Sequence, residues 1–511
     1  MGFSQVSSTD NDPVLSSWPE GCRRIDIISS KDGSLQPFIF LEASGKEVRP
    51  LIVSLHTWSG GYDQKDTLVW QCLENNYNYI HPHFRGRNNN PEACGSPEAI
   101  TDIDDAIIFA INTGHVDRSQ IHITGSSGGG YATLLAYMRS ALDIKTFSAW
   151  VPISDLVKWF YESEGRKSEY SKDISKATGG WTDEKNYSVV MEEAVNRSPY
   201  YMKTPVEKRK FSKLNIYAGI HDGYTGSVPI TQSILFYNKV VRDFNPAEEK
   251  ALVSDQDIIE MISSRNYVKK PGTTIGDRVI HYEQSYKDRV RIVIFEGGHE
   301  NLIDVALDHT GGKNILAIGD SNGAFPEGWV DQLKKIRSGD VIYNTCISGN
   351  TIGFDNNGQK KLNTLRNLDM YMNEAYEQMG DLDDIIIMLG TNDCKAVFKD
   401  SIRMVPDNFR KLLIMIRNHP VYMKFKPRIH VVSPPPAGRD EILIEKYHGG
   451  AQRIARLQPQ FKKIAAQNGT VFVDVYSTLL SVWDKYSSDG IHLKPEGQKI
   501  IAETVNRFMD K

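Results

Sequence analysis

The sequence predicts a protein of two α/β domains, each built around a mainly parallel β-sheet. At 511 residues the chain is too long for a single hydrophobic core. Short apolar stretches alternate with helical patterns in both halves, as they do in parallel sheets with crossover helices. A serine follows a strand-like apolar stretch in each half, at Ser127 and at Ser321. We therefore expect each half to carry its own reactive site.

The overall charge excludes two classes of partner. Lysine plus arginine (60) nearly balances aspartate plus glutamate (64), which leaves a net charge of −4. Because the charges are balanced and interspersed, the sequence indicates no basic surface that would bind nucleic acid or an anionic membrane. No apolar run approaches the roughly 18 residues that a membrane span needs. We expect a soluble protein that binds no nucleic acid and has no membrane span, and its oligomeric state stays open.

No metal or cofactor is indicated. The five cysteines form no Cys-x-x-Cys pair, and no histidines have ligand spacing. Two acidic clusters, 102–105 and 381–384, precede or begin predicted elements. Acidic groups suit the positive end of a helix or a solvated turn, so we interpret neither cluster as a metal site.

The N-terminus gives an ambiguous indication of location. Residues 1–20 are rich in Ser, Asp and Asn, which predicts a disordered polar lead-in. They contain no basic and then apolar signal segment, and Val6 stands where myristoylation of Gly2 would require Ser or Thr. Either the protein is cytoplasmic, or it is secreted or periplasmic and its signal peptide is absent from this chain.

The first domain is expected over 21–308. Apolar patterns predict strands, helices and a helical insertion, which we place by residue number. The strands are expected at 24–28, 36–41, 51–55, 79–81, from 121 to the turn at 125, at 147–153, at 214–218 and at 291–295; the helices at 102–112, 131–138 and 230–241, with an insertion at 247–264.

A second insertion, at about 155–205, mixes charged residues with many aromatic ones. Placed after a sheet strand, it could lie over the strand ends and form a cap above the pocket. Its aromatic side chains could instead pack on the core of the domain. The sequence favours neither interpretation.

Ser127 is the proposed nucleophile of the first domain. It lies in Gly125-Ser126-Ser127-Gly128-Gly129, between a strand and a helix, as in a nucleophile elbow. Small residues suit this turn, because a side chain at Gly125 or Gly129 would collide with the opposing backbone. The five-residue pattern alone is weak, since glycine and serine are also common loop formers.

Two further residues complete a possible relay in the chain order Ser, Asp, His. A serine needs a histidine to take its proton, and the histidine needs a carboxylate to fix its tautomer. Asp222 and His299 each follow a predicted strand. The N–H groups of Gly128 and Trp58 are the expected donors to the oxyanion.

These motifs resemble the prolyl-oligopeptidase-like branch of the α/β-hydrolases. The resemblance covers about 20–308 and is carried by Gly125-Ser126-Ser127-Gly128-Gly129-Gly130-Tyr131, by Asp222 with 227–233 behind it, and by Phe84-Arg85-Gly86. It implies an α/β-hydrolase fold. True oligopeptidases place a large β-propeller before the catalytic domain, and this chain has no room for one. The resemblance therefore implies the esterases of the branch more than its peptidases.

After a short Gly-containing linker at 309–313, strand and helix patterns begin again. Strands are expected at 315–318, 341–344, 385–389, 429–433 and 471–475, within a second domain over 314–511. Four sequence blocks follow these strands or precede the last helix. They are Gly319-Asp320-Ser321-Asn322, Ile347-Ser348-Gly349-Asn350-Thr351, Leu389-Gly390-Thr391-Asn392-Asp393 and Asp489-Gly490-Ile491-His492.

Together the four blocks resemble the SGNH (GDSL-type) hydrolases, and the block around Gly349 resembles their arylesterase and acyl-esterase members. The resemblance implies a flavodoxin-like three-layer α/β/α fold. Ser321 would then attack the acyl carbon, His492 would be its base, and Asp489 would orient the imidazole. The N–H groups of Ser321 and Gly349 and the side-chain amide of Asn392 would hold the oxyanion.

Two serine hydrolase domains in one chain suit a substrate that carries two kinds of ester. We therefore expect a bifunctional carbohydrate esterase acting on acetylated, and in some cases feruloylated, plant polysaccharides, an assignment that rests on family analogy. One alternative makes the first domain a peptidase or polyester hydrolase. Another makes one domain a non-catalytic module that holds the polysaccharide.

Overall fold

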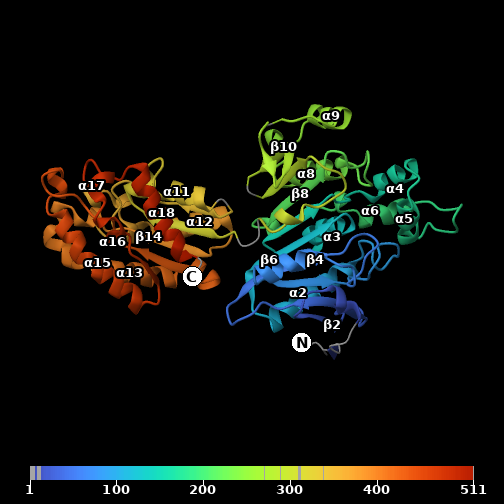
Figure 1. The fold of residues 1–511 in the computed structure, drawn as a ribbon, viewed down its shortest axis with the longest axis horizontal. Helices are drawn as coiled ribbons and strands as arrows, with labels where there is room; N and C mark the ends of the chain where they lie inside the picture. Colours follow the sequence, from blue (N-terminus) through green and yellow to red (C-terminus); the bar gives the residue numbers. More distant parts are fainter. Residues whose placement is uncertain are drawn as a thin grey trace. The chain divides into compact units, whose positions relative to one another are not determined.

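The computed structural model describes residues 6–7, 13–269, 271–287, 289–308, 312–337 and 339–509. The chain divides into two compact units, Met1–Gly311 and Gly312–Lys511, each with its own sheet (Figure 1). Of the predicted linker, 309–311 lies outside the described residues, as do residues 1–5 and 8–12 of the predicted lead-in. Within the described residues, no helix combines the length and the apolar character that crossing a membrane would require.

The first unit is organised around an eleven-stranded sheet in the order β1-β2-β3-β5-β4-β6-β7-β8-β11-β10-β9. Its central strands, from β5 to β11, run parallel, and the strands at both edges are antiparallel. The strands are β1 (Val6–Ser7), β2 (Cys22–Ile28), β3 (Leu35–Leu41), β4 (Arg49–Leu55), β5 (Asn78–Pro82), β6 (Val116–Ser126), β7 (Thr146–Trp150), β8 (Lys213–Gly219), β9 (Thr274–Ile275), β10 (Arg278–Tyr286) and β11 (Val290–Phe295).

Helices cover both faces of this sheet. Apolar side chains of α2, α3 and α8 share one large core with the strands, whereas α1 packs in a separate cluster with β3, β4 and β5. The helices are α1 (Leu68–Glu74), α2 (Pro97–Thr113), α3 (Gly128–Arg139), α4 (Leu156–Gly165), α5 (Tyr170–Thr178), α6 (Met191–Arg197), α7 (Val206–Arg209), α8 (Ile230–Phe244) and α9 (Asp255–Ser264). Short 3₁₀ helices lie at Pro13–Ser17, Pro199–Tyr201, Glu249–Ala251 and Ile303–Val305. The α/β class predicted for this half is confirmed.

Two elements differ from the sequence prediction. The strand expected at 147–153 ends at Trp150, because Val151 has φ = 43° and Pro152 follows, so the backbone leaves the extended region. Parts of the expected lead-in also contact the domain. Val6–Ser7 pairs with β2, and Trp18 is buried with its ring 6.2 Å from that of Tyr79. Burial of this large apolar ring offsets the polar character of its neighbours.

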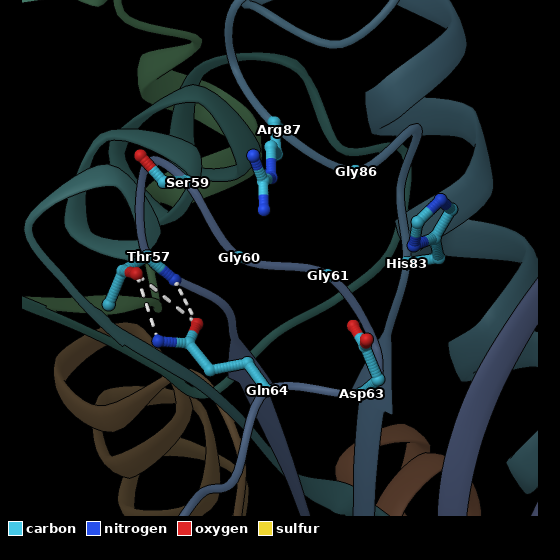
Figure 2. A pocket seen from close by; sticks show the side chains of 9 residues that line it. All are labelled: Thr57, Ser59, Gly60, Gly61, Asp63, Gln64, His83, Gly86 and Arg87. Atoms are coloured by element: carbon cyan, nitrogen blue, oxygen red, sulfur yellow. Dashed lines mark hydrogen bonds between the residues drawn. The ribbon is translucent and has the colours of Figure 1, made fainter. Parts of the chain in front are cut away.

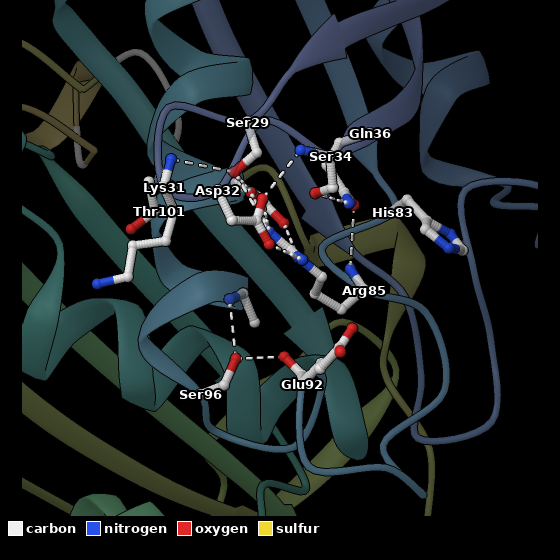
Figure 3. A network of polar contacts seen from close by, with 12 residues as sticks. Ser29, Lys31, Asp32, Ser34, Gln36, His83, Arg85, Glu92, Ser96 and Thr101 are labelled. Carbon is white, nitrogen blue, oxygen red and sulfur yellow. Dashed lines mark hydrogen bonds and ion pairs between the residues drawn. The ribbon is translucent and has the colours of Figure 1, made fainter.

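The first acidic cluster is part of a structural network. Asp102 is buried and accepts hydrogen bonds from Arg85 Nε (2.5 Å) and Ser29 Oγ (2.5 Å). Figure 3 shows Arg85 reaching Asp32 and Ser29 on the β2–β3 turn, and its Nη1 lies 2.7 Å from Asp32 Oδ2. This network ties the loop after β5 to α2 and to the β2–β3 turn.

We expect Asp102→Ala to lower the free energy of unfolding of the first unit by about 3 kcal/mol, because it leaves the buried Arg85 guanidinium without its buried partner. Urea titration followed by tryptophan fluorescence would measure the change. The matched variant Asp32→Ala removes a partner whose side chain is 41% exposed, so it should destabilise the first unit much less than Asp102→Ala does. Equal losses in the two variants would contradict this account of the network.

The second unit contains a five-stranded, fully parallel sheet in the order β13-β12-β14-β15-β16. This is the flavodoxin-like strand order that the resemblance implied. The strands are β12 (Asn314–Gly319), β13 (Val341–Asn344), β14 (Asp384–Met388), β15 (Arg428–Val432) and β16 (Val471–Val473). The predicted strand at 471–475 is shorter because Asp474 caps the next helix, its side chain accepting from the N–H of Ser477.

Alternating side chains of β12 face two different cores, as the period of a strand requires. Ile315 and Ala317 pack with α11, α16 and α18, whereas Leu316 and Ile318 pack with α12, α13 and α15. Two helical layers therefore enclose the sheet. The helices are α10 (Ser321–Ala324), α11 (Trp329–Ile336), α12 (Thr364–Met379), α13 (Val405–Asn418), α14 (Pro420–Phe425), α15 (Gly450–Gln467), α16 (Val475–Leu480), α17 (Trp483–Tyr486) and α18 (Pro495–Met509), with 3₁₀ helices at Asn356–Gly358, Lys360–Leu362, Asn392–Cys394, Ala396–Met404 and Glu445–Tyr447.

Candidate active sites

Ser127 lies at a sharp turn between β6 and α3, where its backbone adopts φ = 58° and ψ = −115°. This is a strained conformation for a residue with a side chain, and strain of this kind is characteristic of functional turns. The turn closes only with glycine on both sides. A Cβ at Gly125 would lie 2.4 Å from the carbonyl oxygen of Gly129, and one at Gly129 would lie 2.1 Å from that of Leu55.

The structure brings Ser127, His299 and Asp222 together in one hydrogen-bonded chain. Ser127 Oγ lies 2.8 Å from His299 Nε2, and His299 Nδ1 lies 2.7 Å from Asp222 Oδ2. One tautomer satisfies both contacts, with the serine hydroxyl donating to Nε2 and Nδ1–H donating to the carboxylate. The second oxygen of Asp222 accepts from the N–H groups of Gly223 (2.9 Å) and Val228 (3.0 Å). These bonds hold the buried carboxylate in place.

The sheet explains why residues so distant in sequence meet. Ser127, Asp222 and His299 follow β6, β8 and β11, which run parallel, so the loops after these strands lie at the same edge of the sheet. Asp222 is 1% exposed, whereas the side chain of His299 is 22% exposed. The imidazole is thus reachable from solvent while its carboxylate partner is not.

The N–H of Trp58 and the N–H of Gly128 meet beside Ser127. A Cβ at Gly128 would lie only 2.2 Å from the backbone nitrogen of Trp58, so this approach requires glycine. Within the described residues, neither N–H donates a hydrogen bond to the protein. Both groups are therefore available to an oxyanion.

The side chain of Gln64 fixes the loop that carries Trp58. Its Oε1 accepts from the N–H of Thr57 at 2.9 Å, and its Nε2 donates to Thr57 Oγ1 at 3.0 Å (Figure 2). His56, fully buried, places its ring nitrogens 2.9 Å from the carbonyl oxygen of Thr57 and 2.8 Å from that of His83. The loop is therefore held from two sides. A pocket of about 400 Å³ adjoins it.

The aromatic insertion packs against this same loop. Trp159 of α4 is buried, its ring lies edge-on to Trp58 at 4.8 Å, and its Nε1 donates to the carbonyl oxygen of Ser227 at 2.9 Å. The indole N–H of Trp58 donates to Asp173 of α5 at 3.2 Å. Trp159 therefore packs on the core of the domain, whereas Tyr161 of the same helix is 59% exposed. The insertion lies beside Trp58, as a cap over this site would.

In the second unit, Ser321, His492 and Asp489 form another hydrogen-bonded chain. His492 Nε2 lies 3.0 Å from Ser321 Oγ, and His492 Nδ1 lies 2.6 Å from Asp489 Oδ2. The other oxygen of Asp489 accepts from the N–H groups of Ile491 (2.8 Å) and His492 (2.7 Å). Partial burial raises the pKa of Asp489, but the N–H and the ring of His492 outweigh it and hold the pKa below its ordinary value.

The amide of Asn392 is oriented by two hydrogen bonds. Its Nδ2 donates to the carbonyl oxygen of Asn350 at 3.1 Å, which can only accept, so the nitrogen is identified. Its Oδ1 accepts from the hydroxyl of Tyr447 at 2.9 Å. The second N–H of Nδ2 is left for an oxyanion. Within the described residues, the N–H groups of Ser321 and Gly349 also donate no hydrogen bond to the protein.

Tyr447 was missed by the sequence reasoning. It ends the short 3₁₀ helix Glu445–Tyr447 between β15 and α15, where no motif indicates a role. Its ring packs with Leu443 and with Ile491, the residue directly before His492. One side chain therefore contacts both the proposed oxyanion donor and the turn that carries the proposed base.

We expect Tyr447→Phe to lower kcat of the second site by about tenfold and to leave KM nearly unchanged, because the amide of Asn392 loses the bond that fixes its orientation. Ester hydrolysis would be measured in a Ser127→Ala background. Tyr476→Phe, which removes the hydroxyl of a half-buried tyrosine of α16, is the matched control. A rise in KM with unchanged kcat would assign Tyr447 to substrate binding instead.

Asp393, beside Asn392, is a buried carboxyl group. Burial raises its pKa from 3.8 to about 7, although the N–H of Ile352 lies 3.0 and 3.1 Å from its two oxygens. The unfolded chain releases this proton near pH 4, whereas the folded chain keeps it until about pH 7. The free energy of unfolding of the second unit should therefore fall as pH rises through this interval.

We expect Asp393→Asn to reduce the decrease of the free energy of unfolding between pH 4 and pH 7. For one such group the decrease is about 1.4 kcal/mol per pH unit at its steepest. Urea titrations at several pH values between 4 and 8 would measure it. Asp400→Asn, at an exposed position, should leave the pH dependence as in the parent. A parent stability that rises from pH 4 to pH 7, with no difference in Asp393→Asn, would contradict the assignment.

Among the described residues, no group of three or more His, Cys, Asp or Glu side chains could hold a metal ion. In the second acidic cluster, 381–384, two side chains make hydrogen bonds to neighbouring strands of the sheet. Asp384 is buried with its Oδ1 2.6 Å from His430 Nε2 of the neighbouring strand, and Asp383 Oδ2 accepts from the N–H of Asn314.

Comparison with known proteins finds a different hydrolase family in each of the two units. The model of the prolyl oligopeptidase family matches residues 68–240, and that of the GDSL-like lipase/acylhydrolase family matches residues 314–500. No curated protein matches the chain. Both resemblances seen in the sequence motifs are confirmed.

Solved structures similar to this chain include three hydrolases. A carbohydrate acetylesterase from Sinorhizobium meliloti is 23% identical, with 38% of this chain and 99% of that chain covered and a TM-score of 0.31. The inhibitor-bound aryl esterase of M. smegmatis is 22% identical, with 39% and 100% covered and a TM-score of 0.32. The acylaminoacyl peptidase of Pyrococcus horikoshii is 18% identical, with 57% of this chain and 40% of that chain covered and a TM-score of 0.36.

Proposed function

We propose that this chain, in which a prolyl oligopeptidase-like α/β-hydrolase domain precedes a GDSL-type hydrolase domain, is a bifunctional serine carboxylic-ester hydrolase. The observation that carries the proposal is the pair of hydrogen-bonded Ser–His–Asp chains, one in each compact unit. Each serine has free N–H donors beside it. A nucleophile, a base, an orienting carboxylate and an oxyanion site are what acyl transfer requires.

In the first site, Ser127 Oγ would attack the ester carbon as His299 Nε2 takes its proton. The charge that develops on the carbonyl oxygen would be held by the N–H groups of Trp58 and Gly128. Asp222 would stabilise the imidazolium, which then protonates the departing alcohol. Water would then attack the acyl-serine ester while His299 takes its proton. The imidazolium would return this proton to Ser127 Oγ as the carboxylic acid leaves.

In the second site, Ser321, His492 and Asp489 would perform the same steps. The oxyanion would meet the N–H groups of Ser321 and Gly349 and the amide of Asn392, a neutral donor whose direction is already fixed.

The substrates we propose are acylated plant polysaccharides or their oligosaccharides. Such polymers carry acetyl and in some cases feruloyl esters, and two different serine sites in one chain suit two kinds of ester. The GDSL-type domain would remove acetyl groups, and the first domain would cleave an acetyl or a bulkier aromatic ester. Because intact polysaccharides lie outside the cytoplasm, this proposal implies a secreted or periplasmic enzyme.

A second candidate function makes the first domain a peptidase, and the family match at residues 68–240 favours it. A chromogenic proline-containing dipeptide substrate separates the two. Its hydrolysis by the parent and its loss in Ser127→Ala would support a peptidase, whereas no turnover across a peptide panel would remove this candidate.

Labelling with a fluorophosphonate probe tests whether both sites react. Mass spectrometry should find two serine adducts per chain, on Ser127 and Ser321, and one adduct in each single serine-to-alanine variant. A single adduct on the parent chain would mean that one domain is a non-catalytic module.

A further inference from the structure

The pocket beside the first site shares a wall with the proposed oxyanion loop. Thr57 and Ser59, the two neighbours of Trp58, both line it. Its volume, about 400 Å³, lies within the range of small-molecule sites. A ligand there would therefore contact the loop that carries Trp58.

The lining carries one charge of each sign. In Figure 2 the loop of Gly60 and Gly61 runs between the side chains of Arg87 and Asp63. Within the described part of the chain, neither of these two side chains makes a hydrogen bond or an ion pair with the protein, and both are exposed. Both charged groups are thus available to a ligand.

His83 adds a neutral donor. Its Nδ1 accepts from the N–H of Tyr62 at 3.5 Å, so the hydrogen of the neutral ring belongs on Nε2. Burial lowers the pKa of His83, which keeps the imidazole neutral near pH 7. Together with the hydroxyl of Ser59, the pocket offers donors and acceptors of several kinds.

This lining matches a neutral polyhydroxyl ligand better than a charged one. A lone anion would be attracted by Arg87 but repelled by Asp63, and a lone cation would meet the reverse. Sugar hydroxyls both donate and accept, so they can serve a guanidinium, a carboxylate and an imidazole at once.

Both walls of the pocket are fixed before any ligand binds. The first is held by the bonds between Gln64 and Thr57. The second, the loop after β5, is anchored by Arg85 on the buried Asp102. At Gly86, where φ is 74°, a Cβ would lie 2.9 Å from His83 Cε1, so a side chain would press on the imidazole. A preformed site loses less entropy on binding.

We infer that this pocket is a subsite for a neutral sugar unit adjoining the ester cleaved at Ser127, recognised by Arg87, Asp63 and His83. The inference rests on the proposed carbohydrate esterase function and extends it by locating where the saccharide is held.

Binding is tested first with a ligand that cannot react. Unacylated xylotetraose would be titrated calorimetrically into the full chain carrying Ser127→Ala and Ser321→Ala. Adding Arg87→Ala or Asp63→Ala should each weaken binding at least tenfold, because each removes charged hydrogen bonds. The control Arg118→Ala, at an exposed position near the start of β6 and far along the strand from Ser127, should not change the affinity.

An anionic probe tests the neutral character of the ligand. Trigalacturonate should bind more weakly than xylotetraose. If it binds more tightly, loses its affinity in Arg87→Ala and gains affinity in Asp63→Ala, the pocket is an anion site and the inference is wrong.

Kinetics separate this inference from the proposed function. In a Ser321→Ala background, the ratio of kcat/KM for acetylated xylotetraose to that for 4-nitrophenyl acetate should fall at least tenfold in Arg87→Ala. If acetylated xylotetraose is hydrolysed and neither this ratio nor the xylotetraose affinity changes in Arg87→Ala and Asp63→Ala, the subsite is wrong while the esterase function stands. If no acylated saccharide is hydrolysed by the parent chain, the proposed function fails, whether or not xylotetraose binds.

Discussion

Ser127→Ala is expected to lower kcat for ester hydrolysis at the first site by about 10⁵- to 10⁶-fold, and Ser321→Ala to do the same at the second. Alanine removes the attacking oxygen, so the imidazole that lies 2.8 Å or 3.0 Å from it has no proton to accept. The backbone change is small, because alanine keeps the Cβ that the turn already accommodates.

The two variants also separate the proposed activities. Hydrolysis of methyl ferulate should be lost in Ser127→Ala and kept in Ser321→Ala, whereas release of acetate from acetylated xylan should fall most in Ser321→Ala. Both are measured by product release under initial-rate conditions. If each single variant keeps every activity of the parent, the division of work between the domains is wrong.

Asp222→Asn is expected to lower kcat at the first site by about 10⁴-fold. The asparagine would fill the same buried space, but an amide can present its NH₂ group to His299 Nδ1. The ring would then carry its hydrogen on Nε2 and could no longer accept the proton of Ser127. Methyl ferulate hydrolysis measures the loss, and a matching urea midpoint shows that the fold is intact.

Asp489→Asn is the matched change in the second site, where we expect a smaller loss. The side chain of Asp489 is 51% exposed against 1% for Asp222, so water can take over part of its role. A loss below tenfold in Asp222→Asn would show that this carboxylate does not set the tautomer of His299.

Much of the fold followed from local patterns in the sequence. Buried parallel strands such as 51–55 and 385–388 consist mostly or wholly of apolar residues, and the turn around Ser127 has few other possible conformations. The order Ser, Asp, His along the chain, with each residue just after a predicted strand, also predicts that Asp222 and His299 lie near Ser127. Parallel strands bring their carboxyl ends to one edge, so residues 172 positions apart in sequence can share a hydrogen bond.

What the sequence could not indicate depends on long-range packing in irregular segments. Tyr447 contacts Asn392 across 55 residues from a loop without periodicity. Arg87 and Asp63 line one pocket because the loops that carry Gly61 and Gly86 both lie against the ring of His83. Neither residue belongs to a recognisable motif. The polar neighbours of Trp18 predict a disordered lead-in, whereas the burial of its ring places it against the domain.

Each hydrogen-bonded chain draws all three of its members from a single compact unit. If both are active, as we propose, every translated copy of the polypeptide would deliver the two centres in equal number, whatever the level of expression. A damaging mutation in one half would leave the proposed residues of the other in place, so selection could adjust two specificities separately while their stoichiometry stays at one to one.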